Sequence, residues 1–270
     1  MNKKKLVILP MMVLCLASFA GAWHPHLLFW KKKKKAVVTD TVAKKTEYEK
    51  LFNKQHKIVR GFITLHQIDG KVYFELPVTL LGKDMLIGST VTNVSDNGNA
   101  IVGSKPNAPL LVKFTRNKTH VQLREVNTDY VTSETAIDSA LVKSHTDAIL
   151  SNTKIAAWSK DSSAVVFDMT PFFVSDNKKM SPFDDNSAYS SSYNRSESYK
   201  GENSYLVDVK AFSDNVSIKS SLSYTFSLTS RGGKKLITDR PFTAELTRSI
   251  MLLKEKPYRP RMADYRIGFF

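Results

Sequence analysis

The sequence predicts an α+β fold that is mostly antiparallel β structure, with one principal helix at about 133–150 packed on a sheet. Two observations lead to this prediction. Short apolar runs alternate with polar residues and are separated by Gly, Asn and Asp turn signals, which is typical of antiparallel strands with one buried face. A clear helical spacing of apolar residues occurs in one segment. With 42% hydrophobic and 10% aromatic content, the 270-residue chain can bury a sizeable core in one or two domains.

Residues 1–22 have the three-part form of a secretory signal peptide. Lys3–Lys5 precede an apolar run over 6–19, and small residues stand before Trp23. Two alternatives remain open: acylation of Cys15, or an uncleaved anchor over 6–30, long enough to span a bilayer. Leu14 stands where acylation needs a small residue, and prolines and histidines weaken the anchor. We therefore expect an exported protein that is periplasmic, outer-membrane-associated or secreted.

The single cysteine lies in the leader, so a mature chain would hold no disulfide. An exported protein of this kind depends on packing or ligands for its stability, which indicates the bacterial envelope rather than a small disulfide scaffold.

The formal charge of +15 is concentrated at the N-terminus, where residues 1–35 hold eight lysines and no acid. Residues 23–45 are predicted to be a basic polar linker. Lys31–Lys35 could contact anionic lipid, although such a run beside a signal is more often solvated. No nucleic-acid partner is predicted, and membrane contact is expected only through the leader or this run.

A small β-hairpin domain is predicted over 46–96. It begins near a short helix in "TEYEKLF". Apolar runs at 58–65 and 72–76 then flank Asp69-Gly70, a strong hairpin signal. A turn at Gly82 leads into a strand that ends near Val94.

A larger β-rich domain with one helix is predicted over 105–270. "LLVKFTRNKTHVQLREV" indicates a hairpin that turns near Asn117. The helix is expected after Ser133 as N-cap, because Ile137, Ala140 and Leu141 recur at helical spacing. Strands are expected in "KIAAWS" and "AVVFDMTPFF", joined by a turn at "KDSS".

The polar stretch 175–204 is predicted to be a long mobile loop. Beyond it, alternating residues over 205–211 and 216–228 predict half-buried strands. Arg231-Gly232-Gly233 is expected to turn the chain into a further strand region at 236–253.

The sequence offers no catalytic, cofactor-binding or metal residue that can be assigned. No H-E-x-x-H, G-x-S-x-G, P-loop or Rossmann glycine set is present. The six histidines, none at metal-ligand spacing with Glu between, are His24, His26, His56, His66, His120 and His145.

Two weak metal candidates remain. His24 and His26 form a pair without a third ligand, and His145 has no second ligand on its helix. Asp184-Asp185 near Asp176 could hold calcium through oxygen ligands, but a solvated acidic turn is the simpler interpretation.

Several long segments resemble a known family. "RGFITLHQIDGKVYFELPVTLLGKDMLIGSTVTNVSDNG" is similar to the small N-terminal domain of large secreted bacterial zinc-dependent metalloproteases. These proteins carry two domains of unknown function ahead of a gluzincin-like catalytic domain. "AVVFDMTPFFVSD", "KAFSDNVSIKSSLSYTF" and "RSIMLLKEKPYRPRMADYRIGFF" resemble parts of the second domain. The resemblance covers roughly residues 46–270.

The resemblance implies a non-catalytic N-terminal scaffold or pro-region-like part of an exported zinc metalloprotease. Zinc is the cofactor of complete family members, but no position here matches its ligands or the catalytic Glu. The chain is expected to be inactive alone and to bind no zinc tightly. Its partner would be a catalytic domain C-terminal to Phe270, so the C-terminal end is expected to be truncated.

The C-terminal stretch 254–270 supports that expectation. Pro257 and Pro260 favour an extended connector, and Ile267, Phe269 and Phe270 would enter the core of the next domain. The alternative is that they fold back on this chain.

A second hypothesis is a self-sufficient envelope module that binds protein or glycan. Its Ser/Tyr-rich loop would present Tyr189, Tyr193 and Tyr199 as exposed aromatic contacts.

Overall fold

The computed structural model describes residues 45–128, 135–184, 189, 192–254 and 266. The chain divides into two units, 1–43 and 44–270, and all described residues belong to the second. The predicted signal peptide at 1–22 and nearly all of the linker at 23–45 therefore lie outside the described residues, as does most of the stretch 254–270. No helix in the described part of the chain is long and apolar enough to cross a bilayer.

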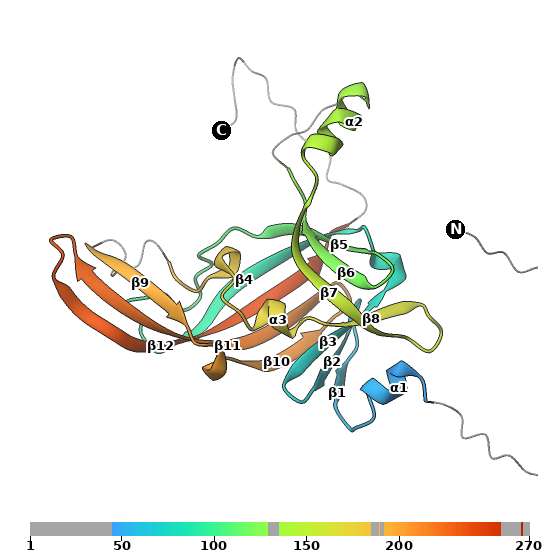
Figure 1. Ribbon diagram of the computed structural model, residues 1–270, viewed down its shortest axis with the longest axis horizontal. Coiled ribbons are helices and arrows are strands. Elements are labelled where there is room, and N and C mark those ends of the chain that lie inside the picture. The colour runs from blue at the N-terminus through green and yellow to red at the C-terminus, as the bar shows by residue number, and fades with distance from the viewer. Residues whose placement is uncertain (1–44, 129–134, 185–188, 190–191, 255–265, 267–270) are drawn as a thin grey trace, which may run out of the picture. The chain divides into compact units, whose positions relative to one another are not determined.

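The described strands form one twelve-stranded sheet in which neighbouring strands run antiparallel (Figure 1). The strand order is β1-β2-β3-β8-β7-β6-β5-β4-β12-β11-β10, with β9 pairing β11 off this path. The prediction of mostly antiparallel β structure is confirmed.

The N-terminal part contains the predicted short helix and hairpin. Thr46 and Glu49 form a capping box that starts α1. Asp69 (φ 48°) and Gly70 (φ 75°) turn β2 into β3, the left-handed pair that a two-residue hairpin requires. The elements are α1 (Glu47–Leu51), β1 (Lys57–Val59), β2 (Thr64–Ile68), β3 (Lys71–Pro77), η1 (Val78–Leu80) and β4 (Asp84–Val94).

The middle part contains the hairpin predicted at Asn117 and the turn predicted at "KDSS". Asn117 accepts hydrogen bonds from the N–H groups of Thr119 and His120, which fixes the first turn. The elements are β5 (Leu110–Arg116), β6 (His120–Glu125), α2 (Thr135–Ser144), β7 (Ala148–Trp158), β8 (Ala164–Asp168) and α3 (Thr170–Phe173).

The principal helix was predicted too long and in the wrong environment. It ends at Ser144, and β7 begins at Ala148. α2 stands away from the sheet (Figure 1), and Ile137 is 46% exposed. Its apolar stripe is interrupted by Ser and Ala, so it offers little area to bury against a sheet.

The described part of 175–204 contains regular elements where a loop was predicted. β9 adds Tyr193–Tyr199 to the edge of β11, and Met180 and Phe183 are buried. The elements of the C-terminal part are η2 (Lys178–Met180), β9 (Tyr193–Tyr199), η3 (Gly201–Asn203), β10 (Tyr205–Ala211), β11 (Asn215–Ser230) and β12 (Lys235–Leu252).

The two ends of the strand order meet, so the sheet curls back on itself. The N–H of Phe62 donates to the carbonyl of Phe212 over 2.9 Å, and Lys57 forms an ion pair with Asp208. This contact joins the β1–β2 edge to β10.

The blocks predicted at 46–96 and 105–270 share this sheet. β3 pairs β8, and β4 pairs both β5 and β12. Both segments therefore contribute strands to one sheet.

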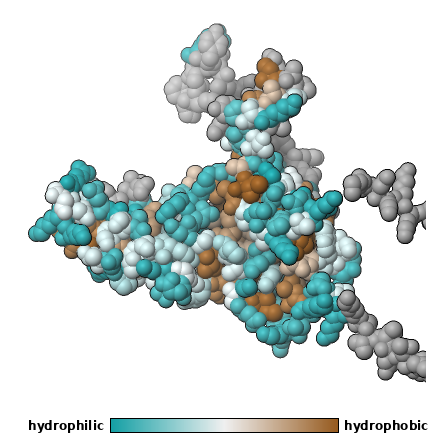
Figure 2. Space-filling model, in the orientation of Figure 1, coloured by the Kyte–Doolittle hydropathy of each residue, from teal (hydrophilic) through white to brown (hydrophobic). Residues whose placement is uncertain are grey.

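The interior contains two large apolar clusters and a small third one. The first includes Phe74, Phe114 and Phe167, and the second includes Tyr224, Phe226 and Phe242. The third consists of Tyr73, Ala157 and Val166, against which residues of α1 pack. On the visible outer face, apolar surface lies mainly along the middle of the molecule and at the outer end of α2 (Figure 2).

Arg248 of β12 is a buried cation in the interior of the protein. Arg248 is fully buried, as are most of the side chains around it. Its Nη1 donates to the carbonyl of Phe173 over 2.8 Å and to Ser220 Oγ. Burial lowers the pKa of Arg248 to about 10, because desolvation disfavours the charged form.

Candidate functional site

The densest group of titratable side chains outside the core lies beneath α1. It joins Tyr48 of α1, His56 before β1, His66 of β2 and Glu75 of β3. The hairpin turn at Asp69-Gly70 sets its register, because His66 pairs opposite Tyr73 and lies diagonally from Glu75. Same-face diagonal neighbours in a hairpin are within reach of long side chains.

A continuous chain of hydrogen bonds links these groups. Tyr48 donates its hydroxyl to Glu75 Oε2 over 3.0 Å, and His66 Nε2 lies 2.7 Å from the same oxygen. His66 Nδ1 lies 3.0 Å from His56 Nε2. His56 Nδ1 then lies 2.8 Å from the carbonyl oxygen of Lys54.

Counting protons shows what this chain of contacts requires. The Lys54 carbonyl only accepts, and an ionised Glu75 only accepts. Three contacts made by two imidazole rings then need three N–H protons, whereas two neutral rings supply two. All three contacts can therefore be hydrogen bonds at the same time only when one ring carries a second proton.

Phe52 covers the two imidazoles. Its ring stacks on His66 with centroids 4.1 Å apart and on His56 at 4.9 Å. It also meets Tyr48 edge-on at 4.9 Å. His66 is only 2% exposed, so its contact with Glu75 is shielded from water, which strengthens it.

The surroundings shift two pKa values in the network. The hydrogen bond from His66 is the main cause that lowers the pKa of Glu75, and the bond from Tyr48 adds to it. Burial, followed by the bond to Glu75, raises the pKa of Tyr48 to about 12. Glu75 is therefore a carboxylate at neutral pH, and Tyr48 keeps its proton as a donor.

The contacts of this network hold separate elements of the fold together. The network contains no Ser, Thr or Cys nucleophile hydrogen-bonded to a histidine, as nucleophilic catalysis needs. Within the described ranges, no group of three or more His, Cys, Asp or Glu side chains is placed to hold a metal ion. The network instead links α1 and the segment before β1 to the β2–β3 hairpin.

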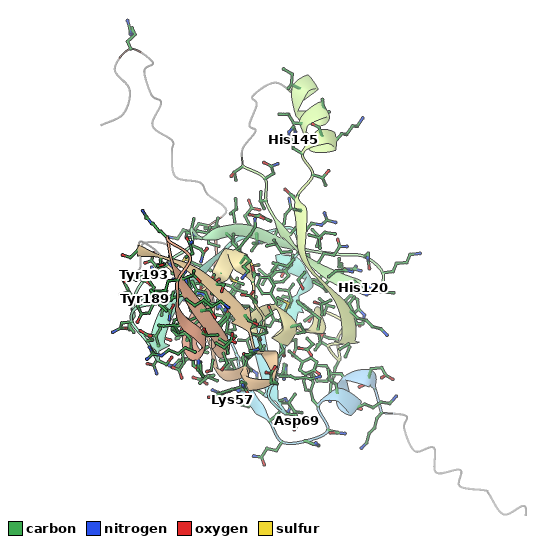
Figure 3. The ribbon with its side chains drawn as sticks, turned by 60° about the vertical axis from the view of Figure 1, so that its left-hand side comes forward. Lys57, Asp69, His120, His145, Tyr189 and Tyr193 are labelled. Carbon is green, nitrogen blue, oxygen red and sulfur yellow. The ribbon has the colours of Figure 1, made fainter. Side chains whose placement is uncertain are left out.

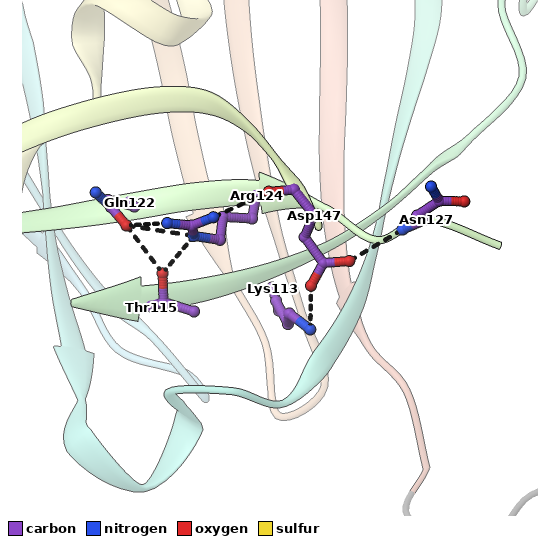
Figure 4. A network of polar contacts seen from close by, with 6 residues as sticks. All are labelled: Lys113, Thr115, Gln122, Arg124, Asn127 and Asp147. Carbon is purple, nitrogen blue, oxygen red and sulfur yellow. Dashed lines mark hydrogen bonds and ion pairs between the residues drawn. The ribbon is translucent and has the colours of Figure 1, made fainter. Parts of the chain in front are cut away.

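A second polar network anchors the start of β7 (Figure 4). Asp147 forms an ion pair with Lys113 of β5 and accepts from the N–H of Asn127 over 3.1 Å. Arg124 of β6 donates to the carbonyl of Asp147 over 2.9 Å and to Gln122 Oε1 over 2.7 Å. Burial alone would raise the pKa of Asp147, but these partners outweigh it and lower the pKa.

The other histidines do not join these networks. His120 lies in the β5–β6 turn beside Thr119, and His145 follows α2 beside Ser144; the two are far apart in the view of Figure 3. His24 and His26 lie outside the described residues.

The acidic candidates for calcium do not gather into a described site. Asp176 forms an ion pair with Lys178 at 2.8 Å. Asp184 is half-buried, and Asp185 lies outside the described residues.

The three tyrosines expected on an exposed loop are half-buried instead. All three pack on the second apolar cluster. Tyr189 stacks on Phe226 at 6.0 Å, and Tyr199 meets Tyr224 edge-on at 5.5 Å. Tyr189 and Tyr193 lie together at that end of the molecule (Figure 3). Pairing of β9 with β11 explains the difference, because it brings these side chains onto the core.

Sequence reasoning did not bring His56, His66 and Glu75 together. A usable signal was present, because counting outward from Asp69-Gly70 places His66 and Glu75 on one face. The position of α1 above them had no such signal.

Two families match the chain. Residues 103–270 match a domain of unknown function, DUF5117, and residues 45–94 match a second domain of unknown function, DUF5118. Neither a curated protein nor a solved structure matches the chain.

Proposed function

The chain belongs to the DUF5117 family, and from that premise we propose that it is the non-catalytic scaffold of an exported zinc-dependent metalloprotease. In this proposal it packs on a zinc-binding catalytic domain encoded after Phe270 and shapes the cleft of that domain or holds it latent. The chain itself contributes neither zinc ligands nor a catalytic Glu.

The observation that carries the proposal is the continuity of the sheet across both family matches. β4 lies in the DUF5118 segment and pairs β5 and β12 of the DUF5117 segment. Segments that share one hydrogen-bonded sheet hold each other in place, which suits a platform for a further domain better than a pair of mobile modules does.

The use of the polar side chains is consistent with this role. His66 and Glu75 hold α1, and Lys113 and Asp147 hold the start of β7. These groups are engaged in contacts that support the fold, and a scaffold needs no further reactive group.

A direct test begins with the coding DNA after the Phe270 codon. If that DNA encodes an H-E-x-x-H segment, the segment is produced in three forms. It is made alone, mixed with the present chain as a separate protein, and fused to the present chain. We expect the present chain to raise the soluble yield and thermal midpoint of the zinc-binding segment and to change its peptide hydrolysis. The present chain alone should not hydrolyse casein with zinc present.

A Gly61→Ala chain is the matched control, because it should disrupt closure of the sheet while adding only one methyl group. Equal effects of the two chains would contradict a folded scaffold. Absence of any H-E-x-x-H segment in the downstream DNA, or hydrolysis by the present chain alone, would also contradict the proposal.

A further inference from the structure

A groove of about 500 Å³ lies between the first turn of α1 and the end of β7. Thr46, Glu47 and Tyr48 form one wall, and Lys118 and Thr119 of the β5–β6 turn lie on another side. The segment from Lys154 to Lys160 lines it along β7. Figure 1 shows α1 beside this end of the sheet.

The backbone of β7 changes neighbours at this groove. Its register with β6 runs from Ala148 to Lys154, and its register with β8 runs from Ile155 to Trp158. The last link to the β6 side is the bond from the N–H of Ile155 to the carbonyl of Thr119, 2.9 Å long. Across the described strands, Ala156–Trp158 thus has a strand neighbour on one side only, and such an edge offers N–H and C=O groups to an added strand.

Three lysines and one glutamate are the charged side chains that line the groove. Lys118, Lys154 and Lys160 line the groove, and neither Lys118 nor Lys154 has an ion-pair partner among the described side chains. Lys160 pairs with Glu49 at 3.3 Å in an exposed contact, which water screens. The lining acid, Glu47, is engaged by Lys50 at 2.6 Å.

The groove also has an aromatic element. Trp158 lines it and lies beneath the guanidinium of Arg116, 5.3 Å from the ring centroid. A cation held on an indole ring adds positive charge near the edge without an acidic partner.

We propose that this groove, the β7 edge groove, binds an extended acidic peptide segment that adds as a strand to Ala156–Trp158. Its backbone would bond to the open edge, while its carboxylates would face Lys118 and Lys154. Main-chain bonds supply affinity and alternate side chains supply specificity in this mode of recognition. The proposal goes beyond the scaffold function, since it requires no catalytic domain.

The experiment uses the full chain with Trp23→Phe and Trp30→Phe, which leaves Trp158 as the sole tryptophan. The probe is a heptapeptide of alternating valine and aspartate. Its binding is measured as the change in Trp158 fluorescence emission. We expect saturable binding with a Kd of about 100 µM or tighter. Two comparison peptides replace aspartate by asparagine or carry N-methyl groups at alternate backbone positions.

Lys118→Gln with Lys154→Gln should weaken binding about tenfold, because both charges lie along the edge. Lys210→Gln with Lys234→Gln is the matched control, since both lysines are exposed and do not line the groove. The asparagine and N-methyl peptides should bind at least about tenfold more weakly.

Several results would overturn the proposal. The asparagine peptide or the N-methylated peptide could bind as tightly as the aspartate peptide. The control substitutions at Lys210 and Lys234 could weaken binding as much as those at Lys118 and Lys154. No emission change up to about 1 mM peptide, a limit of weak affinity, would also overturn it. So would tighter binding of an anionic polysaccharide, which cannot add as a strand.

Discussion

His66 and Glu75 form a diagonal pair across the β2–β3 hairpin, with Nε2 of the imidazole 2.7 Å from Oε2 of the carboxylate. Glu75 also accepts from Tyr48, so one carboxylate connects the hairpin to α1. The pair lies under Phe52, where exclusion of water makes its loss more costly than that of a surface ion pair.

Glu75→Gln should lower the free energy of unfolding at pH 7 by about 1–2 kcal/mol, because bonds to a charged acceptor are stronger than those to an amide. The folded state lowers the pKa of Glu75 below its ordinary 4.5. Its contribution is therefore complete above pH 4.5 and declines as the pH falls toward the folded pKa.

Urea unfolding of both chains across acid and neutral pH measures this effect. The difference between them should shrink as the pH falls below 4.5. Glu202→Gln, in the exposed η3 turn, is the control and should differ little from the parent. A gap that widens on acidification would refute the role assigned to Glu75.

The proton count in the His56–His66 network has its own test. Ring 15N chemical shifts distinguish a doubly protonated imidazole from a neutral one. We expect one imidazolium shared by the pair while all three contacts of the network persist. Two neutral rings with the contacts intact would show that Glu75 holds the proton instead.

Gly61→Ala should prevent the β1–β2 edge from meeting β10. A Cβ built at Gly61 would lie 2.2 Å from the carbonyl oxygen of Phe212 and 2.7 Å from its nitrogen. Both are backbone atoms, so relief requires movement of the strand, and we expect a loss of about 3 kcal/mol.

Gly88→Ala is the matched control, because a Cβ there meets no atom within 4 Å. Thermal unfolding of the two variants should separate them by many degrees. Similar midpoints would mean that the closure contact contributes little to stability.

The sequence predicts local structure here better than it predicts what covers a surface. Asp69-Gly70 and Asn117 identify their hairpins, because turn residues with left-handed backbone or side-chain capping act within a few positions. The helix α2 was also recognised, but the prediction that it packs on the sheet was wrong. Helical spacing alone does not show whether a side chain is covered, and Ile137 is 46% exposed.

Longer-range relationships were missed for the same reason. The pairing of β9 with β11 joins strands that are separated by η3 and β10, and alternation in "YNRSESY" is too weak to signal it. The network of Tyr48, His66 and Glu75 depends on α1 lying over the β2–β3 hairpin. The buried position of Arg248 depends on its hydrogen bond to the carbonyl of Phe173. None of these partners is near in sequence.

Arg248 should be replaceable by an apolar side chain of similar length. Ser220 Oγ already donates to the carbonyl of Phe173 over 2.9 Å, so Arg248→Met leaves that carbonyl satisfied and removes a buried charge. We expect stability within about 1 kcal/mol of the parent, or higher. Arg248→Ala leaves a cavity and should cost about 3 kcal/mol.

Denaturant unfolding of both variants, with the slope compared to confirm two-state behaviour, distinguishes the two cases. If Arg248→Met is as unstable as Arg248→Ala, the hydrogen bonds of the guanidinium outweigh the cost of burying its charge. Arg248 would then stabilise the fold.

The helix α2 should be dispensable for folding. Glu125 and Ala148 are register partners on β6 and β7, so the strand ends on either side of the excursion are already adjacent. We propose replacing 128–146 by Asn-Gly, which keeps Asn127 and Asp147 and their contact with each other. Because Ile137 is largely exposed, removal costs little buried area, and the free energy of unfolding should change by less than about 1 kcal/mol.

Leu123→Ala on β6, a buried position, tests the sensitivity of the same assay and should cost about 2–5 kcal/mol. A loss of similar size on removing α2 would show that the helix packs on the sheet in solution.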